Sequence, residues 1–178
     1  MCKELIQATK KDYESILEAY DQIIEGTPDM DKFARWKKGL HPNEESIQEY
    51  IEQGAMYLLK CEEKIAGTMA VTMSQGEDYQ EIEWKIVASD EEVSVIHLLG
   101  VNPAFQKKGI GGKLVDAAIQ LARENHKKAV RLDALDSNAP AKQMYLQKGF
   151  VFCGKKKLYA DNTGWIDFCF FEKECING

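Results

Sequence analysis

The sequence predicts one mixed α/β domain, built on a central, mostly antiparallel sheet of about seven strands with about four flanking helices. Three observations support this fold class. Short alternating or β-branched segments recur along the chain, amphipathic helical patterns stand between them, and no linker, repeat or low-complexity run divides residues 1–178. A chain of 178 residues is long enough for one core and short for two.

The first quarter of the chain alternates one strand with helical segments. A short strand is predicted over residues 5–8, and a helix begins near Thr9 and runs to about Glu25. Apolar residues at helical spacing then predict a further helical segment over 29–40. Trp36 in this segment either packs in the core or contacts a substrate. Another helix is predicted over 46–53, where Gly54 stops it.

Strand patterns dominate the middle of the chain. Residues 56–61 and 65–73 form a predicted hairpin, joined by Glu62-Glu63-Lys64. Residues 79–87 alternate apolar and charged side chains, which suits either a strand or an insertion lying over the sheet. The β-branched run over 95–101 predicts a central strand.

The last third of the chain predicts a strand, a short helix and a closing hairpin. The strand covers 129–134, and Asn138 is placed to cap a short helix over 139–147, which Gly149 terminates. Strands over 151–159 and 165–172 follow, joined across a polar turn.

Composition limits the location and partners of the chain. The N-terminus lacks an apolar signal region and no run is long enough to span a bilayer, so we expect a cytoplasmic protein with no membrane partner. The five cysteines are then expected to be reduced thiols, and without paired Cys or His spacing no metal site is expected. A net charge of −6 disfavours nucleic acid and favours a cationic acceptor such as an amine.

A glycine-rich turn, Gln106 to Gly112, joins the central strand to a helical pattern. Glycines allow backbone N–H groups to converge, and the helix start adds unpaired donors, so the turn is suited to bind a phosphate. The dinucleotide fingerprint is excluded because Leu114 stands where it needs glycine. The P-loop is excluded because Lys113 is followed by Leu114 rather than Ser or Thr.

Two signatures together resemble the GNAT family, the Gcn5-related N-acetyltransferases. The first is Gln106, Gly109 and Gly111 after Leu99-Gly100-Val101. The second, downstream, comprises Arg131-Leu132-Asp133, Asn138, Ala141, Tyr145 and Gly149-Phe150. The resemblance covers about residues 4–173. It implies the GNAT acyl-CoA N-acyltransferase fold, with acetyl-CoA as co-substrate, no metal, and direct transfer of acetyl to an amine.

The resemblance also implies which residues bind CoA. The main chain of the central strand pairs with the pantetheine arm, and the turn binds the pyrophosphate. Lys107 and Lys108 either contact the 3′-phosphoadenosine, which is expected of at least one of them, or belong to a solvated loop. Asn138 either orients the pantetheine or only caps its helix. The implied CoA-binding residues are Leu99, Gly100, Val101, Gln106, Lys107, Lys108, Gly109, Ile110, Gly111, Gly112, Asn138 and Ala141.

Two catalytic residues are assigned with it. Tyr145 matches the position of the acid that protonates the CoA thiolate, although a core tyrosine beside Phe150 is the alternative. His97 is the candidate base, expected on the same face as Leu99 and Val101, with Glu81 and Glu83 as alternatives. Arg131 and Asp133 should share one face of their strand and are expected to serve structure rather than catalysis.

Three alternatives stay open for the function. The chain could be a CoA-binding sensor without catalysis, a protein or peptide N-acetyltransferase, or an acyltransferase with a donor longer than acetyl. A small-molecule amine is the expected acceptor. Family members are often dimers, which makes a homodimer an expectation, but no segment identifies its interface.

Overall fold

The structure, a computed structural model, describes residues 2–175. Within this range seven strands and four α-helices follow the predicted order, which confirms the mixed α/β fold class. The elements are β1 (Cys2–Gln7), α1 (Tyr13–Gly26), α2 (Glu44–Glu52), β2 (Met56–Cys61), β3 (Lys64–Thr72), β4 (Val93–Val101), α3 (Ile110–Glu124), β5 (Ala129–Leu135), α4 (Ala139–Gln147), β6 (Val151–Ala160) and β7 (Gly164–Glu174).

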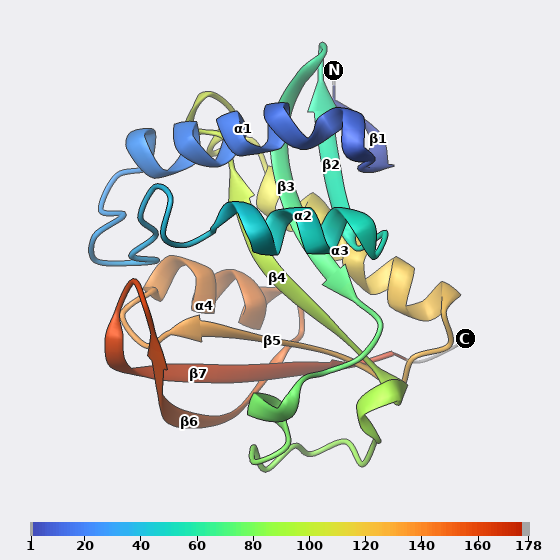
Figure 1. The fold of residues 1–178 in the computed structure, drawn as a ribbon. Coiled ribbons are helices and arrows are strands. Elements are labelled where there is room, and N and C mark those ends of the chain that lie inside the picture. The colour runs from blue at the N-terminus through green and yellow to red at the C-terminus, as the bar shows by residue number, and fades with distance from the viewer. Residues whose placement is uncertain (1, 176–178) are drawn as a thin grey trace.

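All seven strands form one sheet in the order β1-β2-β3-β4-β5-β7-β6. Only β4 and β5 run parallel; every other neighbouring pair is antiparallel. Helices α1 and α2 cover one face of the sheet, and α3 lies behind it (Figure 1). The side chains of α3 and α4 share one buried cluster with the sheet, and those of α1 and α2 share another.

The two central parallel strands separate along their length. They pair only over Val93 to Val95 on β4 and Ala129 to Arg131 on β5. Beyond these residues β4 turns away, and the two strands diverge as a V that is open in Figure 1. The divergence leaves one edge of β4 and the facing edge of β5 without a strand partner at the centre of the sheet. We call this opening between the unpaired edges of β4 and β5 the cleft.

A β-bulge accompanies the divergence. Ala70 pairs with His97 and Thr68 with Gly100, so two residues of β4 stand opposite one residue of β3. The extra residue is Leu98, which has a φ of 53°. Its carbonyl accepts a hydrogen bond from the Tyr20 hydroxyl at 2.7 Å. A bulge of this kind bends its strand, which explains why β4 leaves β5 at this point.

One segment differs from its predicted form, and for another the structure decides between two predicted forms. Residues 29–40 do not form the predicted helix, because Asp29 and Arg35 adopt left-handed φ angles of 57° that break it into turns. Residues 79–87 form no strand; they belong to an irregular segment, residues 73–92, that covers the sheet. We call residues 73–92 the cover segment. Its side chains form a third buried cluster with Val95 and Phe170.

Cysteine chemistry differs from the prediction at one position. Cys153, Cys169 and Cys175 are free thiols, as expected. Cys61 is disulfide-bonded, so the expectation of a reduced thiol is wrong there. The antiparallel register of β1 and β2 places position 2 opposite Cys61, which brings two cysteine positions together. None of the described helices is both long and apolar enough to cross a membrane.

Candidate active site

The glycine-rich turn leads directly into α3. Gly109 precedes the helix with a φ of 77°, a conformation that favours glycine, and α3 begins at Ile110. The first N–H groups of a helix have no intrahelical acceptor, so they point into the turn together with the positive end of the helix dipole. Lys107 and Lys108 are exposed beside them. The arrangement is the predicted anion-binding site.

Close packing around the turn leaves little room for larger residues. A Cβ at Gly111 would lie 3.1 Å from the sulfur of Met144, and one at Gly112 would lie 3.1 Å from a side-chain carbon of Lys148. The turn is also joined to α1, because Gln106 donates a hydrogen bond to the hydroxyl of Thr27 at 3.2 Å. At Gly109, by contrast, no heavy atom lies within 4 Å of the place of a Cβ, so the backbone before α3 is open on that side.

Asn138 caps helix α4, and Tyr145 lies within that helix. The Asn138 side chain accepts a hydrogen bond from the backbone N–H of Ala141 at 3.3 Å, so it caps the helix as one of its two predicted roles requires. Tyr145 is 7% exposed, and its ring lies 6.0 Å from the rings of Phe150 and Phe171. Burial raises the pKa of its hydroxyl, and the carboxylate of Asp133 raises it further.

The bulge places His97 on the face opposite to the predicted one. Leu99 and Val101 pack in the cluster shared with α3, whereas Leu98 packs in the cluster shared with α1 and α2. His97 stacks on Tyr50 of α2 at 5.5 Å between ring centroids. The expectation that His97 shares a face with Leu99 and Val101 is wrong, because simple alternation along the strand fails across one extra residue.

His97 has a polar neighbour and a low proton affinity. Its Nε2 lies 3.1 Å from the hydroxyl of Thr72. Burial lowers the pKa of His97 from 6.5 to about 4. The imidazole is therefore neutral at neutral pH. It also lines a pocket of about 570 Å³ with Thr72, Gln53 and Gln75.

Asp133 stands on β5, across the cleft from β4. Its carboxylate accepts a hydrogen bond from the Tyr79 hydroxyl at 2.5 Å. Burial raises the pKa of Asp133 and the negative charge of Asp78 raises it too, while the hydrogen bond from Tyr79 lowers it. The Asp133 charge in turn raises the pKa of Tyr50 and Tyr145. Asp133 thus contacts Tyr79 of the cover segment, and its charge also acts on Tyr50 of α2 and Tyr145 of α4, whose pKa values burial raises most.

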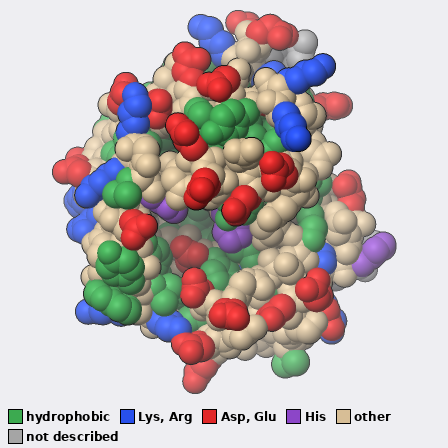
Figure 2. All heavy atoms as spheres, in the orientation of Figure 1, with side chains coloured by type: hydrophobic (Ala, Val, Ile, Leu, Met, Phe, Trp, Pro, Cys, Tyr) green, Lys and Arg blue, Asp and Glu red, His purple; other side chains and the backbone are tan. Residues whose placement is uncertain are grey.

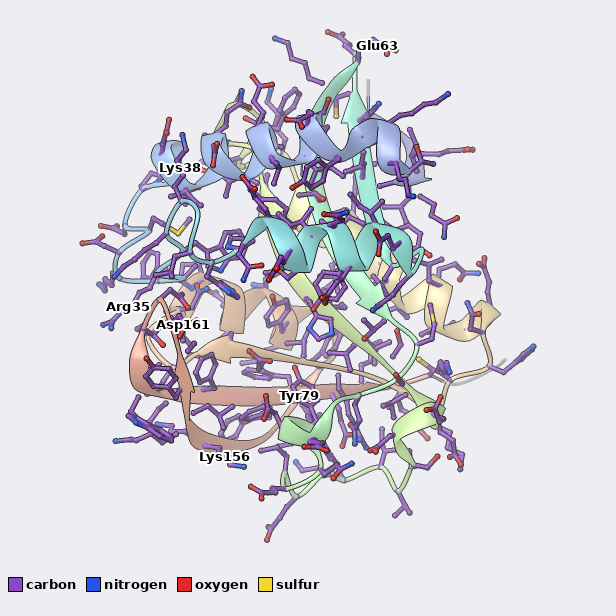
Figure 3. All side chains as sticks on the ribbon, viewed as in Figure 1. Arg35, Lys38, Glu63, Tyr79, Lys156 and Asp161 are labelled. Carbon is purple, nitrogen blue, oxygen red and sulfur yellow. The ribbon has the colours of Figure 1, made fainter. Side chains whose placement is uncertain are left out.

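The same residues remain within reach of solvent. Residues 97–99 of the central strand and Asp133 are only partly buried, although they lie in the middle of a seven-stranded sheet. Figure 2 shows a hollow on the face of the molecule that bears α1 and α2, with hydrophobic side chains inside it and acidic side chains around its rim. Tyr79 lies where the cover segment passes in front of the sheet (Figure 3). Part of the surface of Asp133 is therefore accessible to solvent.

The other residues named from the sequence lie elsewhere or serve structure. Arg131 and Asp133 share a face as predicted, and Arg131 forms an ion pair with Glu172 at 3.2 Å. Glu81 is exposed and paired with Lys156, and Glu83 is exposed. Trp36 packs edge-on against Tyr20 at 5.8 Å and also lines a second pocket of about 580 Å³. No group of metal-ligating side chains stands together in the described part of the chain.

Sequence reasoning missed the place of Asp133 at the cleft. A carboxylate two residues after an arginine on a strand suggests an ion pair, and the alternation gives no sign that Arg131 is paired with Glu172 instead. The one sequence signal for a role of Asp133 in the site was the place of its strand, β5, which comes next along the chain after the central strand, β4. Only the divergence of β4 from β5 turns that place into the wall of a cleft.

A helix start suited to an anion thus follows the strand that separates from β5, and the fold can be compared with those of known proteins. A profile of the Acetyltransferase (GNAT) family matches residues 12–150, and the chain belongs to that family. YhfO of Bacillus subtilis (strain 168), an uncharacterized N-acetyltransferase, is 30% identical over 81 residues. That match covers 46% of this chain, and the chain spans about half, 48%, of the length of this curated relative.

Solved structures share the whole fold. A GNAT family acetyltransferase from Listeria monocytogenes superposes with a TM-score of 0.71 at 24% identity, covering 96% of this chain and 94% of that one. YncA from Salmonella typhimurium, a putative acetyltransferase solved with acetyl-CoA, gives 0.69 at 17% identity and covers 98% and 95%. These similarities confirm the predicted GNAT fold.

Proposed function

We propose that the chain is an acetyl-CoA-dependent N-acetyltransferase that transfers acetyl directly to the primary amine of a small molecule. The observation that supports this most is the cleft between β4 and β5, which has Asp133 and Tyr145 beside it and the glycine-rich turn near its end. Family membership and the acetyl-CoA bound to YncA support the identity of the acyl donor.

The backbone holds the donor in this proposal. The N–H groups at the start of α3 bind the pyrophosphate, and Lys107 or Lys108 adds charge. The main chain of Leu99 to Val101, which has no partner strand on its β5 side in the described structure, pairs with the pantetheine arm. The glycine-rich turn fits such a ligand because nothing lies within 4 Å of the place of a Cβ at Gly109, which leaves its backbone open to the phosphates. The thioester then lies in the cleft beside Tyr145.

The side chains in the cleft move the protons. Asp133 attracts the ammonium of the acceptor and accepts its proton, which frees the lone pair of nitrogen for attack on the thioester carbonyl. As the new C–N bond forms, the C–S bond breaks, and Tyr145 donates its proton to the departing thiolate. The second proton that the nitrogen loses on becoming an amide restores the Tyr145 hydroxyl by way of solvent, and Asp133 releases its own proton to solvent. Asp133 suits the role of base better than His97, since its carboxylate also attracts the ammonium by charge, whereas His97, whose pKa burial lowers to about 4, carries no charge at neutral pH.

Direct transfer is favoured over a cysteine intermediate. Burial raises the pKa of Cys153 to about 11 and that of Cys169 to about 11, so neither is a thiolate at neutral pH. The acidic rim of the hollow favours a cationic acceptor over an anionic one. A protein N-terminus as acceptor, and a CoA-binding sensor without turnover, are the alternatives that the experiment must separate.

Release of free CoA from acetyl-CoA, measured against a panel of amines, tests the proposal. The panel spans arylalkylamines, polyamines, amino acids, aminoglycosides and peptides, and CoA affinity is measured in parallel by calorimetry. Turnover on a small amine supports the proposal. Turnover on peptides alone would identify a peptide N-acetyltransferase, and tight CoA binding with no turnover would identify the sensor.

A further inference from the structure

The cover segment has almost no regular structure, yet it brings Tyr79 to the active site. Apart from two short 3₁₀ turns, residues 73–92 form neither helix nor strand. Such a segment needs contacts outside itself to keep one conformation. The structure supplies them through one fully buried carboxylate, Glu172 of β7, and the arginine opposite it on β5, Arg131.

Glu172 holds the backbone of the cover segment directly. One of its oxygens, Oε2, accepts hydrogen bonds from the N–H of Lys85 at 2.7 Å and the N–H of Ile86 at 3.0 Å. The thiol of Cys153 donates to the same oxygen at 3.4 Å. The other oxygen, Oε1, accepts from Nε of Arg131 at 3.2 Å. Glu172 is 0% exposed, and these four donors satisfy its charge.

Arg131 holds the same segment at three more places. Its guanidinium donates to the side chain of Gln75 at 2.8 Å and to the carbonyl of Ile86 at 2.8 Å. The group also lies over the ring of Trp84, 4.3 Å from its centroid. Arg131 is 1% exposed. Together the pair contacts the cover segment near its start, at Gln75, and in its middle, at residues 84–86.

A short path joins this pair to the carboxylate in the cleft. The indole N–H of Trp84 donates to the carbonyl of Tyr79 at 2.7 Å, and the two rings lie 5.5 Å apart. Both rings pack edge-on against Phe170, the β7 residue that pairs with Asp133. Tyr79 is thereby fixed with its hydroxyl on Asp133.

We propose that Glu172 and Arg131 are positioning residues of the acetyl-transfer site, which act through Trp84 to hold the Tyr79 hydroxyl on Asp133. The proposal rests on the proposed function, in which Asp133 accepts the proton of the amine. Neither Glu172 nor Arg131 touches the reacting atoms. Their effect on the reaction is to keep the proton affinity of Asp133 at the value that Tyr79 sets.

Several polar groups face Asp133 and must be held constant in any test. Asp78 and Tyr79 come from the cover segment, Tyr50 from α2 and Tyr145 from α4. His97 stands on β4 and stacks on Tyr50. Of these, only Tyr79 donates a hydrogen bond to the carboxylate in the described structure. Loss of that bond removes the one contact that lowers the pKa of Asp133, so the pKa rises.

The carboxyl carbon of Asp133, titrated by ¹³C NMR in the full chain, tests the proposal without any acceptor. Its signal is assigned from its disappearance in Asp133→Asn. In Tyr79→Phe we expect the midpoint to rise by about one pH unit. In Glu172→Gln, whose new amide cannot accept as the carboxylate does, we expect a rise of similar size. The double variant should show no additional rise, because both changes break the same bond.

Two further variants separate positioning from general loss of stability. Trp84→Phe keeps an aromatic ring on Arg131 but removes the N–H that holds Tyr79, so a smaller rise is expected even if Glu172→Gln does not fold. Ile119→Val, in the core contact of α3 on the opposite face, should lower the melting temperature and leave the midpoint unchanged. An unchanged midpoint in folded Glu172→Gln or in Trp84→Phe, or additive rises in the double variant, would overturn the proposal.

Kinetics then link the positioning to the reaction. With an accepted amine, the acid limb of kcat/KM should move to higher pH in Glu172→Gln and Tyr79→Phe alike, while CoA affinity stays at the wild-type value. A moved NMR midpoint without any turnover in the wild type would leave the positioning intact and refute the proposed function. If the acid limb of kcat/KM moved in the variants while the NMR midpoint of Asp133 did not, the proposed positioning role of Glu172 and Arg131 would be refuted.

Discussion

The hydroxyl of Tyr79 donates a hydrogen bond to the carboxylate of Asp133 at 2.5 Å, across 54 residues of sequence. Tyr79 belongs to an irregular segment and Asp133 to the strand beside the cleft. The contact therefore joins the irregular cover segment to the central sheet. It also offsets part of the burial that raises the pKa of Asp133, and so sets how readily this carboxylate accepts a proton.

Replacement of Asp133 by asparagine should remove most of the activity. The amide that Asp133→Asn introduces is nearly the same size as the carboxylate and can still accept from Tyr79, but it cannot take a proton from an ammonium. We expect kcat/KM to fall by about 100-fold or more, and the acid limb of its pH profile to disappear. Steady-state kinetics over a range of pH, with CoA affinity as a control for the fold, provide the measurement.

His97→Gln is the matched variant for the alternative base. Glutamine can hydrogen-bond the hydroxyl of Thr72 as His97 does, but it cannot be protonated. If Asp133 is the base, this variant should retain activity within about tenfold and keep the acid limb. A lost acid limb in His97→Gln, with an intact limb in Asp133→Asn, would assign the proton transfer to His97 instead.

Tyr145→Phe should slow turnover and leave CoA binding intact. The phenyl ring keeps the packing against Phe150 and Phe171, while the proton for the thiolate is lost. A decrease in kcat of about 100-fold is expected, since one general acid contributes a factor of this order. Tyr159→Phe, near the exposed β6–β7 turn, is the control and should match the wild type. Equal turnover in the two variants would exclude Tyr145 as the acid.

The lysines of the glycine-rich turn should contribute to CoA affinity through charge. Lys107→Gln combined with Lys108→Gln removes two positive charges next to the phosphate site, and we expect a several-fold weaker CoA affinity at low salt. The difference from the wild type should shrink as ionic strength rises. Lys157→Gln, on the exposed edge strand β6, changes the net charge without approaching the turn. An equal loss in that control would show a non-local effect of charge.

Local sequence signals were sufficient for most elements of the fold. Strand 56–61 and helix 139–147 are reproduced residue for residue, because each has its own turn or cap, such as Asn138. The segment over 29–40 shows where such signals fail. Its apolar spacing is helical, but Asp29 and Arg35 adopt left-handed angles that tertiary packing imposes and composition does not reveal.

The site was predictable in its backbone and less so in its side chains. The glycine-rich turn is local in sequence, so Gly109 and the start of α3 could be located from the residues alone. The face of His97 depends on one extra residue at Leu98, and the position of Asp133 depends on two strands parting. Neither a bulge nor a divergence of strands has a signature in a run of apolar residues. For this reason the side chains expected to meet the acceptor could be placed only from the structure.

Burial of His97 should make the folded chain less stable as pH falls from about 6.5 to about 4. Its pKa is about 4 in the folded chain and near 6.5 when unfolded, so between these values only the unfolded state binds the proton. Above both values the residue has no effect on the pH dependence. Below them it has cost the folded state about 3 kcal/mol, by the usual conversion of a pKa difference.

His97→Gln isolates this contribution from the titration of carboxylates. Urea unfolding at pH 7 and pH 4.5 should show a larger loss of unfolding free energy in the wild type than in the variant, because glutamine binds no proton. The difference between the two losses should reach about 2 kcal/mol at pH 4.5. Parallel losses in both proteins would mean that His97 takes up its proton in the folded state at the ordinary pH, and that the hollow admits enough water to solvate the imidazolium.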